Sequence, residues 1–183
     1  MSAGEGAAGE RCEEVVIVGG GPAGIAAALQ LRRYGIDPLL IERTRLGGLL
    51  WNAYRIENYP ALPDALPGPE LAQRLALHLR RAQVRLLGAE VRGVGFAPTE
   101  DEPSRRRAEH VPCRRLRLTT SAGEIDTRRL LVATGTEARR PASPRVPPAA
   151  IERVHSEILA LRDLRDARVA IIGGGDAACD YAL

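Results

Sequence analysis

Apolar residues recur along the chain in short blocks, and the spacing within each block predicts its secondary structure. Val15–Val18 is a β-branched run that predicts a buried parallel strand. Ile25–Tyr34 predicts a helix that ends at Gly35, and Pro38–Glu42 predicts a second strand. With the glycines of Gly19–Gly24 between the first strand and the helix, these blocks form a strand–turn–helix–strand unit within about 30 residues.

The same reasoning predicts further elements downstream. Glu70–Gln83 has leucines along one face and predicts an amphipathic helix, and Val84–Val94 predicts a single strand. Three more strands are predicted over Leu116–Thr120, Glu124–Asp126 and Leu130–Ala133. The fold class that follows is α/β: a Rossmann-like domain with a parallel sheet and a small antiparallel β-meander.

Four segments lack such periodicity. Residues 1–11 are small and charged and predict a disordered lead-in, while residues 98–112 predict an exposed, polar hairpin tip. Leu46–Pro69 is a loop that holds four prolines and half of the aromatic residues, and loops of this length are usually functional or disordered. Pro141–Pro148 has four prolines in eight residues and predicts an extended linker.

The sequence repeats itself near its end. Val169–Leu183 aligns without gaps with Val15–Leu29, and both segments carry a triple glycine. A strand over Val169–Ile172 should therefore begin a second Rossmann-like unit. Leu183 lies eight residues after Gly175, so we expect this unit to be C-terminally truncated. The expected order is a lead-in (1–11), a first domain (12–140), a linker (141–150) and an incomplete second domain (151–183).

The first glycine cluster matches the G-x-G-x-x-G pattern at Gly19, Gly21 and Gly24. The first glycine permits a tight turn, the second lets a pyrophosphate approach the backbone, and the third lets the helix pack close to the strand. Glu42 lies 18 residues after Gly24, where an acid accepts hydrogen bonds from ribose hydroxyls and disfavours a 2′-phosphate. The alternative to dinucleotide binding is a glycine turn with a purely structural role. The pattern favours dinucleotide binding and leaves FAD and NAD open.

Two motifs in the long loop resemble thioredoxin reductases. They are Gly47-Gly48-Leu49-Leu50 and Ile56-Glu57-Asn58-Tyr59-Pro60, whose counterparts in that family bracket the flavin. The resemblance implies FAD as the cofactor. Two positions depart from the family pattern, which has glutamine at Leu49 and glycine at Ala61.

Two later motifs extend the resemblance to residues 14–183. Ala133-Thr134-Gly135 follows an apolar run, as in the family, and Gly173, Gly175 and Ala178 have the G-x-G-x-x-A form that the family uses for NAD(P)H. The cofactor-binding residues implied by the motifs and the resemblance together are Gly19, Gly21, Pro22, Ala23, Gly24, Glu42, Arg43, Gly48, Leu50, Asn58, Val91, Ala133, Thr134, Gly135, Gly173, Gly175 and Ala178.

The family's redox-active CxxC motif is missing from its expected place before the second glycine cluster, where the chain has Val154–Ile158. This resembles the thioredoxin reductase-like ferredoxin–NADP reductases. It implies an oxidoreductase that moves electrons from NAD(P)H through FAD to a small molecule, a quinone or a ferredoxin-like protein. No catalytic side chain is expected, because the flavin carries the chemistry. The alternative is a FAD-binding module without activity of its own, and a homodimer is also left open.

Composition narrows the binding partners and the cellular compartment that we expect for the protein. All 26 basic residues are arginine, the net charge is only +3 and the arginines are scattered, so nucleic acid is not an expected partner. The three cysteines are far apart, which excludes a disulfide-rich secreted domain and fits a reducing cytoplasm. They also lack metal-ligand spacing. The longest early uncharged run, Val15–Leu31, is interrupted by glycines and is too short for a membrane span.

Overall fold

The computed structural model of the chain describes residues 12–60, 62, 64–98, 115–137, 147–157, 161, 164–175, 178–179 and 182. These residues fall into two compact units. The first runs up to Gly48 and continues with Ala72–Gly135, and the second consists of Leu49–Leu71 and the residues from Thr136 onward. The predicted lead-in (1–11), residues 99–112 of the charged excursion and residues 141–146 of the linker lie outside the described residues.

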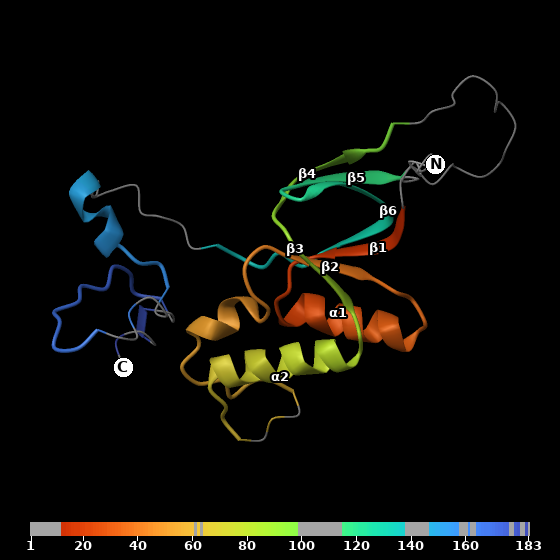
Figure 1. The fold of residues 1–183 in the computed structure, drawn as a ribbon. Helices are drawn as coiled ribbons and strands as arrows, with labels where there is room; N and C mark the ends of the chain where they lie inside the picture. Colours follow the sequence, from red (N-terminus) through yellow and green to blue (C-terminus); the bar gives the residue numbers. More distant parts are fainter. Residues whose placement is uncertain are drawn as a thin grey trace, which may run out of the picture. The chain divides into compact units, whose positions relative to one another are not determined.

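The first unit is built on a six-stranded sheet with the strand order β3-β2-β1-β6-β5-β4 (Figure 1). Four strands are parallel: β1 (Glu13–Val18), β2 (Leu39–Glu42), β3 (Arg85–Gly88) and β6 (Gly123–Val132). The remaining two strands, β5 (Leu116–Thr120) and β4 (Val91–Phe96), continue the sheet in antiparallel pairing. The α/β fold class, with a parallel sheet and an antiparallel meander, is therefore confirmed.

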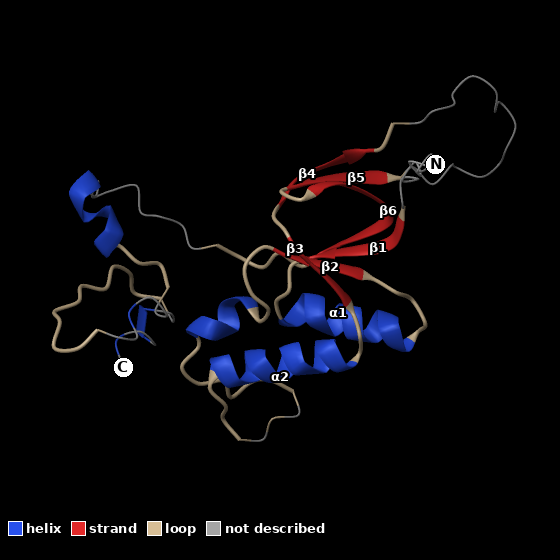
Figure 2. Ribbon diagram, in the orientation of Figure 1, coloured by secondary structure: helices blue, strands red, loops and turns tan. Residues whose placement is uncertain are grey.

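Two α-helices, α1 (Pro22–Arg33) and α2 (Gly68–Arg81), lie in the described part of the chain. Figure 2 shows them beside the parallel strands. Two short 3-10 helices, η1 (Gly48–Asn52) and η2 (Pro148–Arg153), belong to the connecting segments. No helix in the described part of the chain combines the length and the apolar character needed to cross a membrane.

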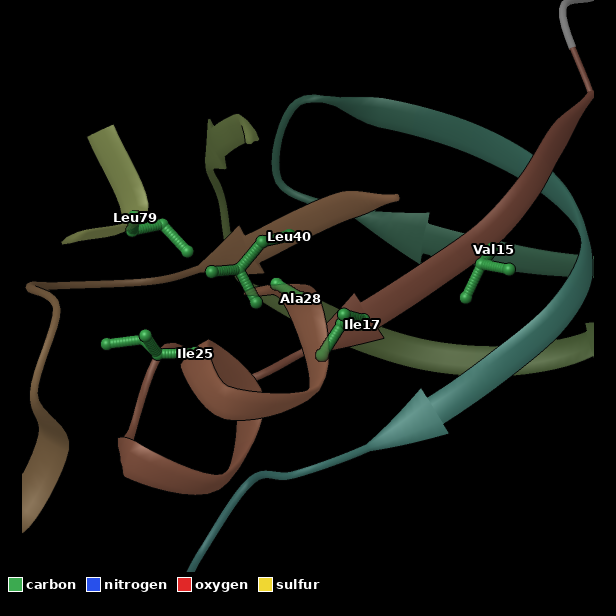
Figure 3. Close-up of a cluster of buried hydrophobic side chains, with 6 residues drawn as sticks. All are labelled: Val15, Ile17, Ile25, Ala28, Leu40 and Leu79. Atoms are coloured by element: carbon green, nitrogen blue, oxygen red, sulfur yellow. The ribbon is translucent and has the colours of Figure 1, made fainter. Parts of the chain in front are cut away.

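Both faces of the two central parallel strands β1 and β2 are buried, as is usual for this kind of sheet. Alternate residues of β1 point to opposite sides. The helix-facing cluster consists of Val15, Ile17, Ile25, Ala28, Leu40 and Leu79 (Figure 3). The opposite cluster consists of Val16, Ile41, Ala89 and Leu118, so the meander strand β5 covers the face that the helices leave open.

Helix α1 begins three residues before the predicted Ile25. It starts at Pro22, because proline suits the first helical position, where a backbone N–H is not needed. It ends at Arg33, just before the predicted stop at Gly35, which has a positive φ of 78°. The N–H groups of Gly35 and Ile36 donate to the carbonyls of Arg32 and Leu31 at 3.0 Å each, which satisfies the last turn.

Two strand predictions were wrong in their extent. The single strand predicted over Val84–Val94 is divided into β3 and β4, because the chain turns at Ala89, which is buried and donates its N–H to the Glu42 carbonyl at 3.1 Å. The strands predicted over Glu124–Asp126 and Leu130–Ala133 are instead one strand, β6. Their polar junction stays in the sheet because the buried Thr127 is paired with Glu13 of β1 on one side and with Leu116 of β5 on the other. The end of β6 is also less buried than predicted.

The strand predicted over Val169–Ile172 is not formed. These residues have no regular secondary structure, and Val169 and Ile172 are 55% and 72% exposed. A parallel strand needs hydrogen-bonding neighbours, and the described residues of the second unit provide only an isolated bridge between Ile56 and Leu66.

The meander contains a buried ion pair that should make its stability depend on pH. Arg117 contacts both carboxylate oxygens of Asp126, at 2.7 Å through Nε and 2.9 Å through Nη2, and the Asp126 side chain is 7% exposed. The hydrogen bonds from Arg117 hold the pKa of Asp126 below its usual value. The pair therefore contributes stability at neutral pH and loses it as the pH falls from about 4 through the lowered pKa.

We expect Asp126→Asn to lower the free energy of unfolding at pH 7 by about 1–3 kcal/mol. The difference from the parent chain should shrink below about pH 4, where the parent loses the same charge. Denaturant unfolding at several pH values would measure it. Glu124→Gln is the matched control, because Glu124 contacts the same arginine at 3.1 Å but is 58% exposed. An equal effect of both substitutions at every pH would contradict the prediction.

Candidate dinucleotide-binding site

The first glycine cluster forms the turn between β1 and α1. The N–H of Gly19 donates to the Ile41 carbonyl of β2, and the N–H of Ala133 donates to the Val18 carbonyl, both at 2.8 Å. The turn therefore lies at the carboxyl ends of β1, β2 and β6. Open α/β sheets bind their ligands at this edge.

The three motif glycines are needed for different reasons. A Cβ on Gly19, whose φ is 106°, would lie 2.2 Å from the Ala133 carbonyl oxygen, and one on Gly24 would lie 1.9 Å from that of Gly19. These two glycines are explained by packing within the chain. Gly21 has an ordinary extended backbone, and no atom of the described chain lies within 4 Å of its Cβ position. Gly21 therefore leaves open space beside the turn, as a close-lying ligand requires.

Helix α1 points an uncapped N-terminus at this space. Among the described residues no side chain caps the helix, and its first turn contains no acidic residue. The N–H groups of Ala23 and Gly24 belong to this first turn, where backbone donors have no partner within a helix. Together with the helix dipole, they favour an anion such as a diphosphate. The residues present thus fit the diphosphate of a dinucleotide.

Glu42 ends β2 beside the turn. Its Oε2 accepts the N–H of Gly20 at 2.7 Å, and its Oε1 accepts the N–H and the hydroxyl of Thr44 at 2.9 and 3.1 Å. Arg43 follows and is exposed. The carboxylate is therefore held next to the glycine turn, where the sequence pattern predicts a ribose.

Gly47 and Gly48, the first two residues of the Gly-Gly-Leu-Leu motif, lie beside the same turn. Gly47 donates its N–H to the Gly20 carbonyl at 2.8 Å, and a Cβ on Gly48 would lie 3.4 Å from the Cα of Gly21. The first unit thus brings together several predicted residues at one edge of the sheet: Gly19, Gly21, Pro22, Ala23, Gly24, Glu42, Gly48 and Ala133.

The other predicted residues are less closely tied to this turn. Thr134 and Gly135 follow Ala133 and are exposed, and the half-buried Val91 opens β4 two residues after Ala89. Five predicted residues belong to the second unit: Leu50, Asn58, Gly173, Gly175 and Ala178. Within that unit Asn58 is exposed, and Ala178 donates its N–H to the Gly175 carbonyl at 2.9 Å. All of these residues remain predicted contacts.

The structure adds residues that the sequence motifs did not single out. Thr44 contacts Glu42, and a Cβ on Gly20 would lie 2.7 Å from the Leu46 side chain. In the second unit, a Cβ on Gly68 would lie 1.9 Å from the Leu50 carbonyl oxygen. The one signal available for Thr44 was its position, because a short polar residue two places after a carboxylate often makes a local hydrogen bond.

The turn, the uncapped helix and the strand-end acid define a Rossmann-type dinucleotide site. Comparison with known proteins agrees with this class. Residues 13–183 match the family model described as "Pyridine nucleotide-disulphide oxidoreductase". The chain belongs to this family.

Individual relatives are similar over most of the chain. NADPH-dependent thioredoxin reductase 3 of Arabidopsis thaliana is 29% identical over 96% of the chain, which covers 32% of that protein. Glucosaminate ammonia-lyase of Pseudomonas fluorescens is 29% identical over 94% of the chain and 50% of that protein. The crystal structure of Lactococcus lactis thioredoxin reductase is 31% identical, with a TM-score of 0.59 over 72% of this chain and 38% of that one.

The chain thus spans about a third to a half of the length of these curated relatives. The resemblance inferred from the motifs is confirmed at the level of the family, whose thioredoxin reductase-like members are FAD-dependent NAD(P)H oxidoreductases.

Proposed function

We propose that this chain binds FAD at the glycine turn and supplies the flavin-binding part of an oxidoreductase. Electrons would pass from NAD(P)H through the flavin to an acceptor, without a CxxC relay. The observation that carries the proposal is the free space at Gly21, which faces the uncapped N-terminus of α1 and lies beside the Glu42 carboxylate.

Each group in the turn has a separate role in this proposal. The backbone at Gly21 and the first-turn N–H groups of Ala23 and Gly24 hold the diphosphate. Glu42 accepts hydrogen bonds from the adenosine ribose. Gly48, Leu50, Asn58 and Ala133-Thr134-Gly135 are proposed as further cofactor contacts, because their motifs resemble those that contact FAD in thioredoxin reductases. Bound FAD supplies the electron-transfer chemistry, while the chain supplies binding and orientation.

The second glycine cluster is proposed to contribute to NAD(P)H binding. Gly173, Gly175 and Ala178 would belong to a second domain over 151–183 that follows a FAD-binding domain over 12–140. The repeat of Val15–Leu29 at Val169–Leu183 supports this division. Glu42 belongs to the first site only, so it bears on the FAD ribose and not on the choice between NADH and NADPH.

The acceptor is proposed to be a small molecule or a ferredoxin-like protein rather than a disulfide. A dithiol relay needs two thiols that can approach each other. The chain has no CxxC motif, and its three cysteines are far apart in sequence. Cys12 is half-buried at the start of β1, whereas Cys179 is exposed in the second unit.

The proposal is tested first by FAD binding to the purified chain, followed by fluorescence quenching. Glu42→Ala should weaken binding by roughly 1.5–3 kcal/mol, or about 10- to 150-fold, because charge-assisted hydrogen bonds to the ribose are lost. Glu14→Ala is the control, since Glu14 is an exposed acid at the opposite end of the sheet and should leave binding unchanged. A parent chain that folds but takes up no FAD would rule out the proposal.

The electron-transfer step needs a separate measurement. Anaerobic addition of NADH or NADPH should bleach the flavin, and an artificial acceptor should then be reduced faster than a disulfide. FAD binding without any bleaching would favour a binding module instead. Rapid disulfide reduction would contradict the absence of a thiol relay.

A further inference from the structure

We propose that Thr44 is a positioning residue that fixes the Glu42 carboxylate in the orientation required by the ribose of FAD. This inference rests on the proposed function, because it assumes that a ribose occupies the space beside Glu42. Thr44 has no place in the sequence motif. Its role follows from the hydrogen bonds around the carboxylate.

Both oxygens of Glu42 are held from opposite sides. The N–H of Gly20 donates to Oε2 at 2.7 Å, and Thr44 donates to Oε1 through its N–H at 2.9 Å and its hydroxyl at 3.1 Å. A carboxylate that is bonded at only one oxygen can rotate about its last torsion. Donors at both oxygens restrict that rotation, so the plane of the carboxylate is set before a ligand binds.

The stem of Glu42 is confined as well. A Cβ on Gly20 would lie 3.1 Å from both Cβ and Cγ of Glu42, so the stem lies directly over the glycine turn. The free motion that remains is at the carboxylate end, which is where Thr44 acts. The turn and Thr44 therefore confine different parts of the same side chain.

The held carboxylate still has acceptor capacity. Two ionised oxygens offer about four lone-pair positions, and Gly20 and Thr44 occupy three of them in this arrangement. A ribose hydroxyl can use the remaining position, which is on Oε2, while Thr44 holds Oε1.

The first test needs no cofactor. The Gly20 amide should be protected from hydrogen exchange by Glu42, and Thr44→Val should accelerate its exchange several-fold, because the carboxylate loses the hydroxyl donor and keeps only the backbone N–H of position 44 at Oε1. Thr44→Ser keeps the hydroxyl and should restore the parental exchange rate. An unchanged Gly20 exchange rate in Thr44→Val would overturn the inference about Thr44 without contradicting the proposed FAD site.

The second test is a double-mutant cycle on the dissociation constant of FAD for the full chain. Thr44→Val should weaken binding roughly three- to tenfold, or about 0.7–1.4 kcal/mol, and Thr44→Ser should bind as the parent does. In the Glu42→Ala background Thr44→Val should have no further effect, because Thr44 acts through Glu42.

The outcomes separate the two claims. A parent chain without FAD affinity would overturn the proposed function, and the ribose role of Thr44 with it. A parent chain that binds FAD, combined with a Thr44→Val effect that is just as large without Glu42, would overturn only the inference and would indicate a general structural role of Thr44.

Discussion

The Gly21→Val chain should fold like the parent and lose FAD. The Cβ position of Gly21 has no neighbour within 4 Å in the described chain, and the backbone has φ −72° and ψ −179°, which valine adopts without strain. The added side chain should therefore be harmless to the fold. It should fill the space from which a diphosphate contacts the turn and the N-terminus of α1.

We expect FAD affinity to fall by at least 100-fold, or about 2.7 kcal/mol, with a melting temperature close to that of the parent chain. Fluorescence titration and circular dichroism measure the two quantities on the same sample. Gly95→Val is a suitable control, because Gly95 also has open space around its Cβ position but lies on β4, at the opposite edge of the sheet from β3 and β2. Parental FAD affinity in Gly21→Val would show that this turn does not bind the diphosphate.

Gly24→Ala should have the opposite profile, with loss of stability as the primary effect. Its Cβ would lie 1.9 Å from the carbonyl oxygen of Gly19, which is a backbone atom and cannot rotate aside. Helix α1 would have to move away from β1, and the buried contact between Ile25 and Ile17 would loosen. We expect a loss of about 3 kcal/mol in the free energy of unfolding, near the upper end of overpacking effects.

Thermal and denaturant unfolding of the apo chain would measure this loss. Gly88→Ala is the matched control for the added methyl group and should stay within about 0.5 kcal/mol of the parent. A Gly24→Ala chain as stable as the parent would contradict the close packing of α1 against the Gly19 carbonyl.

Sequence reasoning succeeded where the constraint is local. The end of α1 just before Gly35 follows from that glycine, and the strand-end position of Glu42 follows from the apolar run before it. These features depend on residues within one turn or one strand of each other. The three motif glycines are also found from a local pattern. Only the structure shows that they differ: Gly19 and Gly24 pack against backbone atoms, whereas Gly21 does not.

Sequence reasoning failed where distant segments decide the outcome. The polar stretch at Thr127 looks like a break between strands, but it remains in β6 because Thr127 pairs with Glu13 of β1, 114 residues earlier, and with Leu116 of β5. The break at Ala89 is set by its bond to Glu42. Thr44 was missed although its partner Glu42 is only two residues away, because the Glu42 carboxylate is also held by the Gly20 amide, 22 residues earlier.

The position of β6 has a consequence for synthesis of the protein. β1 pairs with β6 in a register that joins Glu13 to Thr127 and Val18 to Val132, while β2 follows β1 closely in sequence. At the usual elongation rate of about 5–20 residues per second, one edge of β1 waits roughly 6–23 s for its partner strand. Through that interval the nascent chain carries an unpaired, apolar strand edge, and the carbonyl of Ala133 that closes over Gly19 is not yet made. The ribosome-bound chain should therefore depend on chaperones until β6 has emerged, and it should acquire its nucleotide site late, in one cooperative step.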